Sequence, residues 1–415
     1  TDSVISGNSV FKNNGVGGGI RSTGSTGSNH SDPKVTITNS QISDNHADGG
    51  LGDGGGIYAD AYTILTIKGG STISNNTAVS HGGGIYANGN TILTIQGGST
   101  ISNNEAVLGC GGGIRADDNT IVTIQGSSII SNNKAAVYGG GIYAGGQSGK
   151  AGTGNVNVIL TIQGGSTISN NTAGSDGGGI FSRGLSLEVD SSIVSQNISQ
   201  ATNGGGIYSW HKSTLTVNNS TINNNTATFG YGGGIFIDIG IGNYRNSVSS
   251  QIYYSRIEGN KASRGGGIFN NGELLVYGST IDSNSVIGTN SNNLRDGDGG
   301  GIFNGEGGQL FIYDCTISNN LADKNGGGIA AFRPIGPDYP VPGVWEAKYA
   351  LLGINYLIDY LRPPEPFTIY NSTIAYNQAG QYGGGIYTIS ATGIFNCTIA
   401  YNEAETGAGL ARREY

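Results

Sequence analysis

Two short motifs alternate along nearly the whole chain of 415 residues. One is an apolar residue followed three positions later by asparagine. The other is Gly-Gly-Gly-Ile, which occurs twelve times and ends in a thirteenth, relaxed copy, Gly407-Ala408-Gly409-Leu410. The glycine motifs most often recur 27 to 29 residues apart. A regular period of this length predicts a stack of similar units. The motif asparagines are Asn14, Asn45, Asn76, Asn104, Asn133, Asn171, Asn197, Asn225, Asn260, Asn284, Asn320, Asn377 and Asn402.

Each unit consists of short segments with the alternation that is typical of half-buried strands. In residues 63–67, for example, Leu65 and Ile67 share one face and Thr66 takes the other. The Asn-Gly and Asp-Gly dipeptides that would join hairpins do not recur at the junctions. We therefore expect three strands per unit, each pairing with its equivalent one turn later. The prediction is an all-β chain, folded as a single parallel β-helix of about 13 coils over residues 1–415.

The two motifs have structural roles in such a coil. Stacked asparagines can form a ladder of amide hydrogen bonds along the rod. Glycines permit a tight corner and a positive φ, and the following Ile points into the core. The glycine runs lack the Lys-Ser/Thr that follows the glycines of a phosphate-binding loop, so they do not indicate nucleotide binding.

The paired motifs resemble the GGA(I/L/V) and FxxN motifs of chlamydial polymorphic outer-membrane proteins and related bacterial β-helix surface proteins. Residues 11–14 are a literal FxxN, whereas other coils place Ile or Val at the Phe position, and glycine replaces the alanine of GGA. The resemblance covers nearly the whole length. It implies a right-handed parallel β-helix solenoid that is secreted or displayed on the cell surface and does adhesive or structural work.

Composition narrows the classes of partner. The net charge is −8 and no basic stripe is visible, which argues against a nucleic acid. No apolar run approaches the roughly 18 residues of a transmembrane helix. Histidines are scattered and no metal-binding or cofactor motif is present, so we expect no cofactor and no metal. Because the chain begins within the repeat pattern at Thr1, we expect a processed chain or a piece of a longer one.

Departures from the period predict loop insertions. Four of them follow a glycine motif, after Ile20, Ile142, Ile235 and Ile329, and would therefore emerge from one side of the rod. The largest, residues 331–367, is rich in proline and aromatic residues, and the spacing of its apolar residues, including Trp345, predicts a short helix over 344–361. This segment is either a satellite core lying on the rod or a docking element for a partner.

The residue after each glycine-motif Ile forms a column rich in aromatic side chains. Alternation places this column opposite the inward Ile, and the arginines Arg21 and Arg115 within it favour an outward face. We predict an exposed contact stripe for protein or saccharide. The alternatives are an inward stack or a stripe covered by the insertions. The candidate binding residues, including two tryptophans outside the column, are Tyr58, Tyr86, Tyr143, Phe181, Tyr208, Trp210, Phe236 and Trp345.

The best enzymatic arrangement lies three residues past the glycine-motif Ile. There Asp60 and Asp117 would stack two coils apart, roughly 9.6 Å, with Arg115 nearby. This separation is at the outer limit for the two carboxylates of an inverting glycosidase. Surface aspartates on a rod more often serve solvation, so we expect no enzymatic activity. The alternative is a lyase or hydrolase acting on acidic polysaccharide.

These observations together favour a non-enzymatic extracellular or cell-surface protein with a structural or adhesive function. Its expected partners are a cell-surface protein, a polysaccharide or further copies of itself, joined head to tail or side by side into a filament or multimer.

Overall fold

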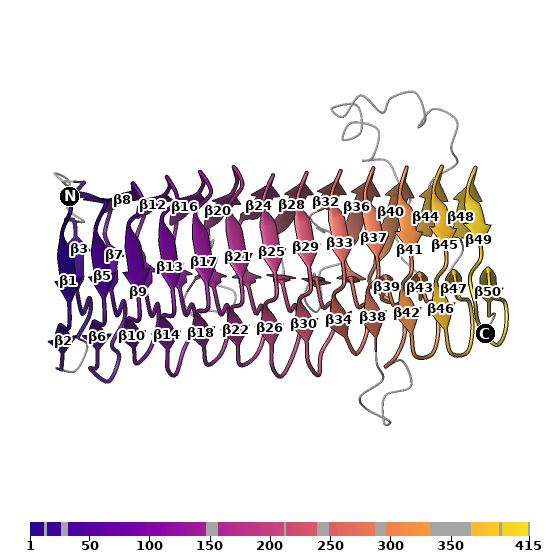
Figure 1. Ribbon diagram of the computed structural model, residues 1–415, viewed down its shortest axis with the longest axis horizontal. Coiled ribbons are helices and arrows are strands. Elements are labelled where there is room, and N and C mark those ends of the chain that lie inside the picture. Colours follow the sequence, from indigo (N-terminus) through magenta and orange to yellow (C-terminus); the bar gives the residue numbers. More distant parts are fainter. Residues whose placement is uncertain are drawn as a thin grey trace.

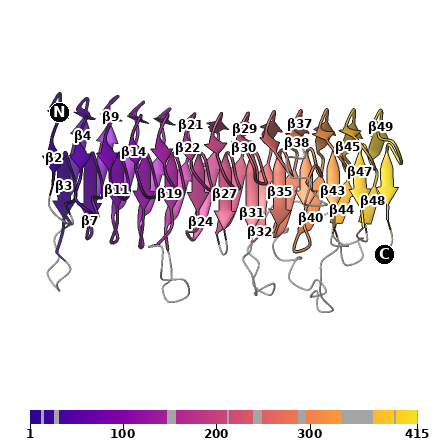
Figure 2. The ribbon, with the colours of Figure 1, turned by 90° about the horizontal axis from the view of Figure 1, so that it is seen from below.

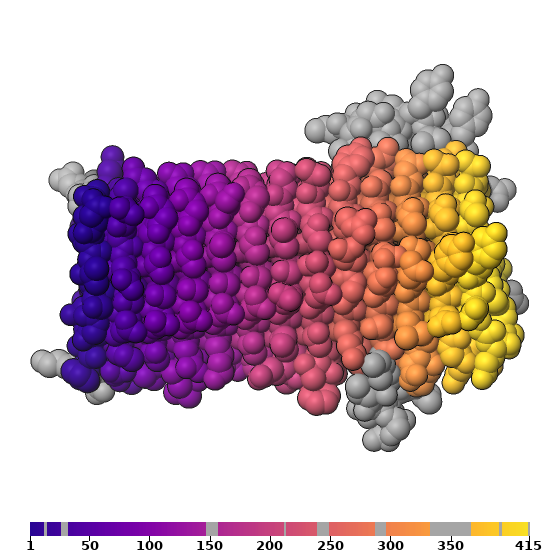
Figure 3. Space-filling view, in the orientation of Figure 1, coloured from indigo at the N-terminus to yellow at the C-terminus, as the bar shows by residue number. Residues whose placement is uncertain are grey.

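The computed structural model is a straight rod in which successive coils stack from one end to the other (Figure 1; Figure 3). It describes residues 1–11, 15–25, 32–146, 157–210, 213–238, 249–286, 296–332, 367–389 and 392–413. Strands β1 to β50 make four parallel sheets of 13, 12, 13 and 12 strands, and in every sheet each strand pairs with its equivalent one coil on. The predicted fold class, a right-handed parallel β-helix, is confirmed.

The first two sheets carry the asparagine motif. The first sheet consists of β1 (Val4–Ser6), β5 (Gln41–Ser43), β9 (Thr72–Ser74), β13 (Thr100–Ser102), β17 (Ile129–Ser131), β21 (Thr167–Ser169), β25 (Ile193–Ser195), β29 (Thr221–Asn223), β33 (Arg256–Glu258), β37 (Thr280–Asp282), β41 (Thr316–Ser318), β45 (Thr373–Ala375) and β49 (Thr398–Ala400). The second consists of two-residue strands, β2 (Ser9–Val10), β6 (His46–Ala47), β10 (Thr77–Ala78), β14 (Glu105–Ala106), β18 (Lys134–Ala135), β22 (Thr172–Ala173), β26 (Ile198–Ser199), β30 (Thr226–Ala227), β34 (Lys261–Ala262), β38 (Ser285–Val286), β42 (Leu321–Ala322) and β46 (Gln378–Ala379).

The third sheet follows the glycines and is seen in the turned view (Figure 2). It consists of β3 (Ile20–Thr23), β7 (Ile57–Asp60), β11 (Ile85–Ala87), β15 (Ile114–Ala116), β19 (Ile142–Ala144), β23 (Ile180–Ser182), β27 (Ile207–Trp210), β31 (Ile235–Asp238), β35 (Ile268–Asn271), β39 (Ile302–Asn304), β43 (Ile329–Ala331), β47 (Ile386–Thr388) and β50 (Leu410–Arg412). The fourth consists of β4 (Lys34–Thr38), β8 (Ile64–Lys68), β12 (Ile92–Ile95), β16 (Ile121–Ile124), β20 (Ile159–Ile162), β24 (Ser186–Asp190), β28 (Thr214–Asn218), β32 (Ser249–Tyr253), β36 (Glu273–Tyr277), β40 (Gln309–Tyr313), β44 (Phe367–Tyr370) and β48 (Thr392–Phe395). A coil thus typically has four strands, and the sequence pattern missed the two-residue strands of the second sheet, which occur in twelve coils.

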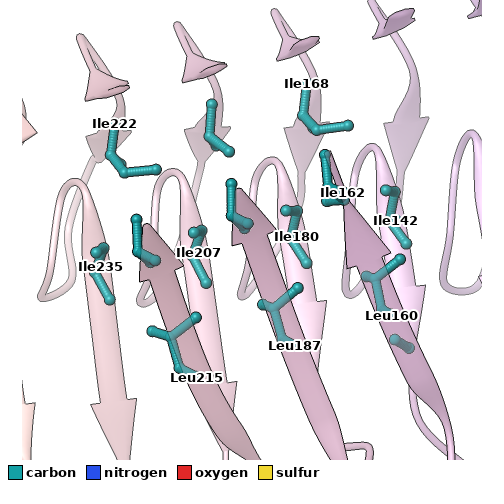
Figure 4. Packing of buried hydrophobic residues seen from close by; sticks show 14 of the residues in the cluster. Ile142, Leu160, Ile162, Ile168, Ile180, Leu187, Ile207, Leu215, Ile222 and Ile235 are labelled. Atoms are coloured by element: carbon teal, nitrogen blue, oxygen red, sulfur yellow. The ribbon is translucent and has the colours of Figure 1, made fainter. Parts of the chain in front are cut away.

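The inner core consists of aliphatic columns that run the length of the rod. Ile168 from the first sheet, Ile180 from the third and Leu187 from the fourth point toward one another inside the coil (Figure 4). In-register parallel pairing places Ile on Ile and Leu on Leu, as in Ile85↔Ile114. A single coil could not bury these side chains, so the stacking of neighbouring coils supplies the stability.

The motif asparagines form a continuous ladder beside this core. From Asn45 to Asn402, the Nδ2 group of each donates to Oδ1 of the asparagine one coil on, at 2.9–3.0 Å. The same Oδ1 also accepts from the backbone N–H of the preceding asparagine, as Asn104 does from Asn76 at 3.0 Å. From Asn45 to Asn377 these side chains are almost completely buried, so the ladder satisfies polar groups that water cannot reach.

The first rung of the ladder is Asn8. Its Nδ2 and its backbone N–H donate to Asn45 Oδ1 at 2.8 and 3.1 Å, and Ile5 pairs with Ile42 in the same register. The sequence analysis assigned Asn14 to the first coil, and Asn14 lies outside the described residues. Asn8 precedes its glycine motif by nine residues, the same interval as for Asn45, whereas Asn14 precedes it by only three.

The three glycines of each motif serve different purposes. In Gly82-Gly83-Gly84 only the first has a positive φ, of 64°. A Cβ on Gly83 would lie 2.5 Å from the carbonyl oxygen of Gly112 in the next coil, and one on Gly84 would lie 3.0 Å from the amide carbon of Asn104. Each glycine run therefore packs directly on the neighbouring coil and its ladder amide, which explains why the two motifs occur together.

The predicted insertions sit at a common corner. The links after Ile20, Ile142, Ile235 and Ile329 all join a strand of the third sheet to one of the fourth. The predicted helix over 344–361 and Trp345 lie outside the described residues. Within the proposed segment 331–367, Ala331 and Phe367 are buried residues of coil strands β43 and β44. No helix in the described part of the chain is long and apolar enough to cross a membrane.

Candidate functional site

The predicted aromatic column lies on the outer side of the third sheet. Its residues form a cluster separate from the inner core, so the side chains do point out of the coil, as alternation requires. From Tyr143 to Phe303 the rings stack face to face, with centroids 4.8–5.2 Å apart and interplanar angles of 4–16°. Offset stacks of this kind add about 0.5–1.5 kcal/mol per pair beyond area burial. The column therefore ties neighbouring coils together.

The exposure that the sequence suggested for this column is wrong. Tyr86, Tyr143, Phe181, Tyr208 and Phe236 are only 2–7% exposed, and Tyr58 and Trp210 are half-buried. Each ring covers the faces of its neighbours. A second layer from the corner before the glycines covers the column from outside, and its packed members include Cys110, Val137, Tyr138 and Tyr231. Buried rings of this kind are not available as a contact stripe.

Arg115 replaces an aromatic residue in the middle of this column. Its guanidinium lies over the rings of Tyr86 and Tyr143, 5.7 and 4.9 Å from their centroids, and only 1% of the residue is exposed. Its Nε donates to Asp117 Oδ2 at 2.7 Å, and the Tyr86 hydroxyl donates to the same oxygen at 3.0 Å. The arginine is thus paired and stacked, which is the condition under which burial of this side chain is tolerated.

Asp117 therefore does not fit the alternative catalytic role. It is completely buried, so a polysaccharide cannot reach its carboxylate. Burial raises the pKa of Asp117 to about 6, against the opposing effects of Arg115 and the Tyr86 hydroxyl, so the pair remains charged at neutral pH. Asp60 lies two coils away in the same column and is half-buried, accepting from Tyr58 Oη at 3.1 Å and from the Ala61 N–H at 2.7 Å. Asp117 and Arg115 are structural groups of the outer layer.

A second buried arginine has the same function near the middle of the chain. Arg264 Nη2 donates to Asp296 Oδ1 at 3.0 Å, and its guanidinium lies 4.5 Å from the centroid of Tyr231 and 5.0 Å from that of Phe303. Asp298 accepts from the Asn325 backbone N–H and Nδ2. Both aspartates thus have protein partners. In the part of the chain that the structure describes, no group of three or more His, Cys, Asp or Glu is placed to hold a metal ion.

The residues that sequence reasoning missed lie on the outer side of the fourth sheet. From β8 onward, at the last position of each strand or one residue beyond it, one side chain per coil points outward in a line that we name the sheet-4 column. The pairing Asp190↔Asn218↔Tyr253↔Tyr277 shows that the column is continuous. The column consists of Lys68, Gln96, Gln125, Gln163, Asp190, Asn218, Tyr253, Tyr277, Tyr313, Tyr370 and Phe395, so its first half is polar and its second half is aromatic.

The sheet-4 column had a readable signal in the sequence. Its members lie one residue past the second inward aliphatic residue of the strand, as in Ile95-Gln96 and Ile312-Tyr313. The glycine motif marks the third sheet more clearly, because no comparable motif precedes the sheet-4 column. All sheet-4 column members are partly or fully exposed, with Phe395 at 44%.

Comparison with known protein families finds similarity in the first, second and third sheets, but not in the fourth. Residues 70–88, 127–145, 165–183 and 314–331 match the repeat of the Chlamydia polymorphic membrane protein. Each match runs from the first sheet through the ladder asparagine to the glycines and the third sheet, and begins after the fourth-sheet strand. No curated protein and no solved structure gives a significant match. In the repeat that builds its coils, the chain is similar to the Chlamydia polymorphic membrane proteins.

Proposed function

We propose that this chain is a non-enzymatic β-helix that works at the cell surface, where it presents an adhesive face on a rigid rod. The observation that carries the proposal is the match of four coils to the repeat of the Chlamydia polymorphic membrane protein. A resemblance in fold alone would not indicate function. The match adds a link to membrane-associated bacterial proteins, and a straight stack of coils is well suited to hold a contact surface away from a cell.

The buried columns support a structural rather than a catalytic use of the repeated residues. The asparagine ladder, the aromatic stack and the Arg115–Asp117 pair all connect one coil to the next. Asp117, the better-placed of the two candidate carboxylates, is buried. The accessible side chains include outward-pointing residues of the first and fourth sheets, which suits recognition of a partner.

Adhesion can be tested with the purified chain. Microspheres coated with folded chain should adhere to bacterial or animal cell layers more strongly than microspheres coated with heat-denatured chain. Labelling of intact source cells with antibodies against the chain should be as strong as labelling of permeabilised cells. Equal adhesion by folded and denatured chain, or labelling only after permeabilisation, would contradict the proposal.

The alternative enzyme class has its own assay. Pectin, alginate and other uronates should show no depolymerisation, measured as new reducing ends or unsaturated products. Activity that disappears in Asp60→Asn would instead support a lyase or hydrolase. Association of the chain with itself stays a prediction, and light scattering over a concentration series tests it.

A further inference from the structure

The sheet-4 column is a long, ordered row of partly accessible polar and aromatic side chains. It passes through eleven successive coils from Lys68 to Phe395. With strands about 4.8 Å apart, this corresponds to roughly 48 Å. Equivalent groups therefore recur at a constant interval along the rod axis, and a polymer lying on this line could bind them in succession.

Amide side chains line the first half of the column. Gln125 Nε2 donates to Gln96 Oε1 at 2.8 Å, and Gln163 Nε2 donates to Gln125 Oε1 at 2.9 Å. These bonds fix the orientation of the amides. A glutamine amide has two N–H groups and two acceptor lone pairs, so Gln125 can still donate once and accept once. Oriented groups that both donate and accept are suited to hydroxyls, which do the same.

A shallow groove of about 610 Å³ lies beside these glutamines. Its volume falls within the range of ligand sites in proteins. Glycines at the corner toward the first sheet, among them Gly97 and Gly126, form part of its lining. The corner at Gly97 and Gly98 has no side chains, and a Cβ on Gly98 would meet nothing within 4 Å. A flat ring can therefore approach the backbone closely at this corner.

The aromatic half of the column differs from the buried stack on the third sheet. Tyr313 and Tyr370 are 6.2 Å apart and inclined by 38°, and Tyr370 and Phe395 are 6.5 Å apart and inclined by 36°. In the buried stack the rings are closer and nearly parallel. The inclined rings cover one another less, which leaves parts of their faces available to a ligand.

The charges near the column disfavour an anionic polymer. Glu188 and Asp190 lie on β24 at the end of the glutamine row, and Asp314 follows Tyr313. Lys68 is the only cation of the column itself. Carboxylates on this face would repel uronates and nucleic acids, especially at low ionic strength.

We propose that the sheet-4 column binds a linear, uncharged polysaccharide that lies along the rod axis. Hydroxyl groups of the polysaccharide would form hydrogen bonds with the glutamine and asparagine amides, and the apolar faces of its sugar rings would pack on the inclined tyrosines. Several weak contacts at a constant interval add up when the ligand is itself a repeating chain. This proposal rests on the proposed adhesive function and specifies the ligand of its contact face. The site lies on the one sheet that the four matched repeats do not include.

Binding is tested on the purified chain with defined oligosaccharides. The neutral probes are linear glucan, mannan, xylan, galactan and N-acetylglucosamine oligomers, and the acidic probes are polygalacturonate and alginate, all measured by isothermal titration calorimetry. We expect saturable binding of at least one neutral oligomer and weaker or no binding of the acidic ones. Absence of binding to every neutral probe, or binding of the acidic probes alone, would overturn the proposal.

Variants then locate the site. Replacing both Tyr277 and Tyr370 by alanine should weaken the dissociation constant about tenfold or more, because two ring contacts are lost. The matched control is Tyr401→Ala: Tyr401 is 74% exposed and stacks on Tyr376, but it lies outside the sheet-4 column. Gln125→Ala should also weaken binding, whereas Gln41→Ala on the first sheet should not. Equal affinity of the double variant and the wild type would refute the site.

A measurement on the unmodified protein guards against misfolded variants. Nitration of exposed tyrosines, mapped by mass spectrometry, should fall at Tyr277 and Tyr370 when the neutral oligomer is bound and stay constant at Tyr401. Protection at Tyr401 alone would refute the site. The microsphere assay separates the two proposals. If the Tyr277 and Tyr370 double variant adheres as well as the wild type, the result contradicts the polysaccharide site but leaves the adhesive function standing. If the wild-type chain itself does not adhere, the result contradicts both proposals.

Discussion

The asparagine ladder offers the most direct test of what holds the coils together. Asn104, near the middle of the N-terminal half, takes part in four hydrogen bonds through its side chain. Its Nδ2 donates to Ile73 O and to Asn133 Oδ1, and its Oδ1 accepts from the backbone N–H and the Nδ2 of Asn76, each at 3.0 Å. Only 1% of the residue is exposed, so water does not replace these partners.

The expected cost of Asn104→Ala follows from what each partner retains. Asn76 Nδ2 keeps its bond to Ile42 O, and Asn133 Oδ1 keeps its bond from the Asn104 backbone N–H. The backbone N–H of Asn76 loses its acceptor, which costs about 1–3 kcal/mol for a buried group. The weakened partners and the space left against Gly84 add to this. We therefore expect the free energy of unfolding to fall by about 3 kcal/mol.

A second substitution, Asn104→Asp, tests whether loss of the Nδ2 donor causes the destabilisation. In Asn104→Asp a carboxylate oxygen replaces Nδ2. This oxygen has no hydrogen to donate to the acceptors Ile73 O and Asn133 Oδ1, so it repels them. At neutral pH this variant should be less stable than Asn104→Ala, and it should recover part of the loss on acidification, because the protonated carboxyl again donates. The recovery would identify the lost donor as the cause.

Thermal and urea denaturation followed by far-ultraviolet circular dichroism measure these changes, and hydrogen exchange at the Asn76 amide reports the local effect. The matched control is Asn103→Gly. Asn103 is exposed and has a φ of 56°, which glycine adopts without strain. The free energy of unfolding of this variant should therefore differ from that of the wild type by less than about 0.5 kcal/mol. An unchanged melting temperature for Asn104→Ala, with unchanged exchange at Asn76, would refute the ladder as a source of stability.

Three further predictions concern packing and charge. Gly83→Ala should destabilise by more than about 3 kcal/mol, because its Cβ would meet backbone atoms at 2.5 Å, whereas Gly98→Asn should cost little at its open corner; similar melting temperatures for both would contradict this packing. Asp117→Asn should lower the free energy of unfolding by about 3–5 kcal/mol in urea titrations, since it leaves a buried arginine without its counter-charge, whereas Asp60→Asn should have a much smaller effect. Burial raises the pKa of Asp298 from 3.8 to about 7, so between these pH values the folded state retains a proton that the unfolded state releases. The wild type should therefore lose stability relative to Asp298→Asn as the pH rises from about 4 to about 7. Parallel pH profiles of the two melting temperatures would show that Asp298 does not cause the pH dependence.

The repeat of the sequence determined the coil. Once every unit carries the same motifs, equivalent residues must stack, and each position becomes a column with one chemistry. Ile85 and Ile114 had to face inward together because alternation and register leave no other arrangement. The same reasoning placed the asparagines on one line. It did not find Asn8, which the register of β1 places next to Asn45 in the first coil.

Tertiary structure alone decided which outward columns are accessible. Alternation predicts that Phe181 points out of the coil, but not that a corner residue, Tyr138, stacks on it from outside. That second layer depends on loop conformations that no two-residue period encodes. In the described part of the chain, Gln125 and Tyr277 of the sheet-4 column remain partly exposed. The sequence could assign a side chain to the inside or outside of a coil because that depends on local alternation, whereas burial on the outside depends on contacts between segments from different corners and coils.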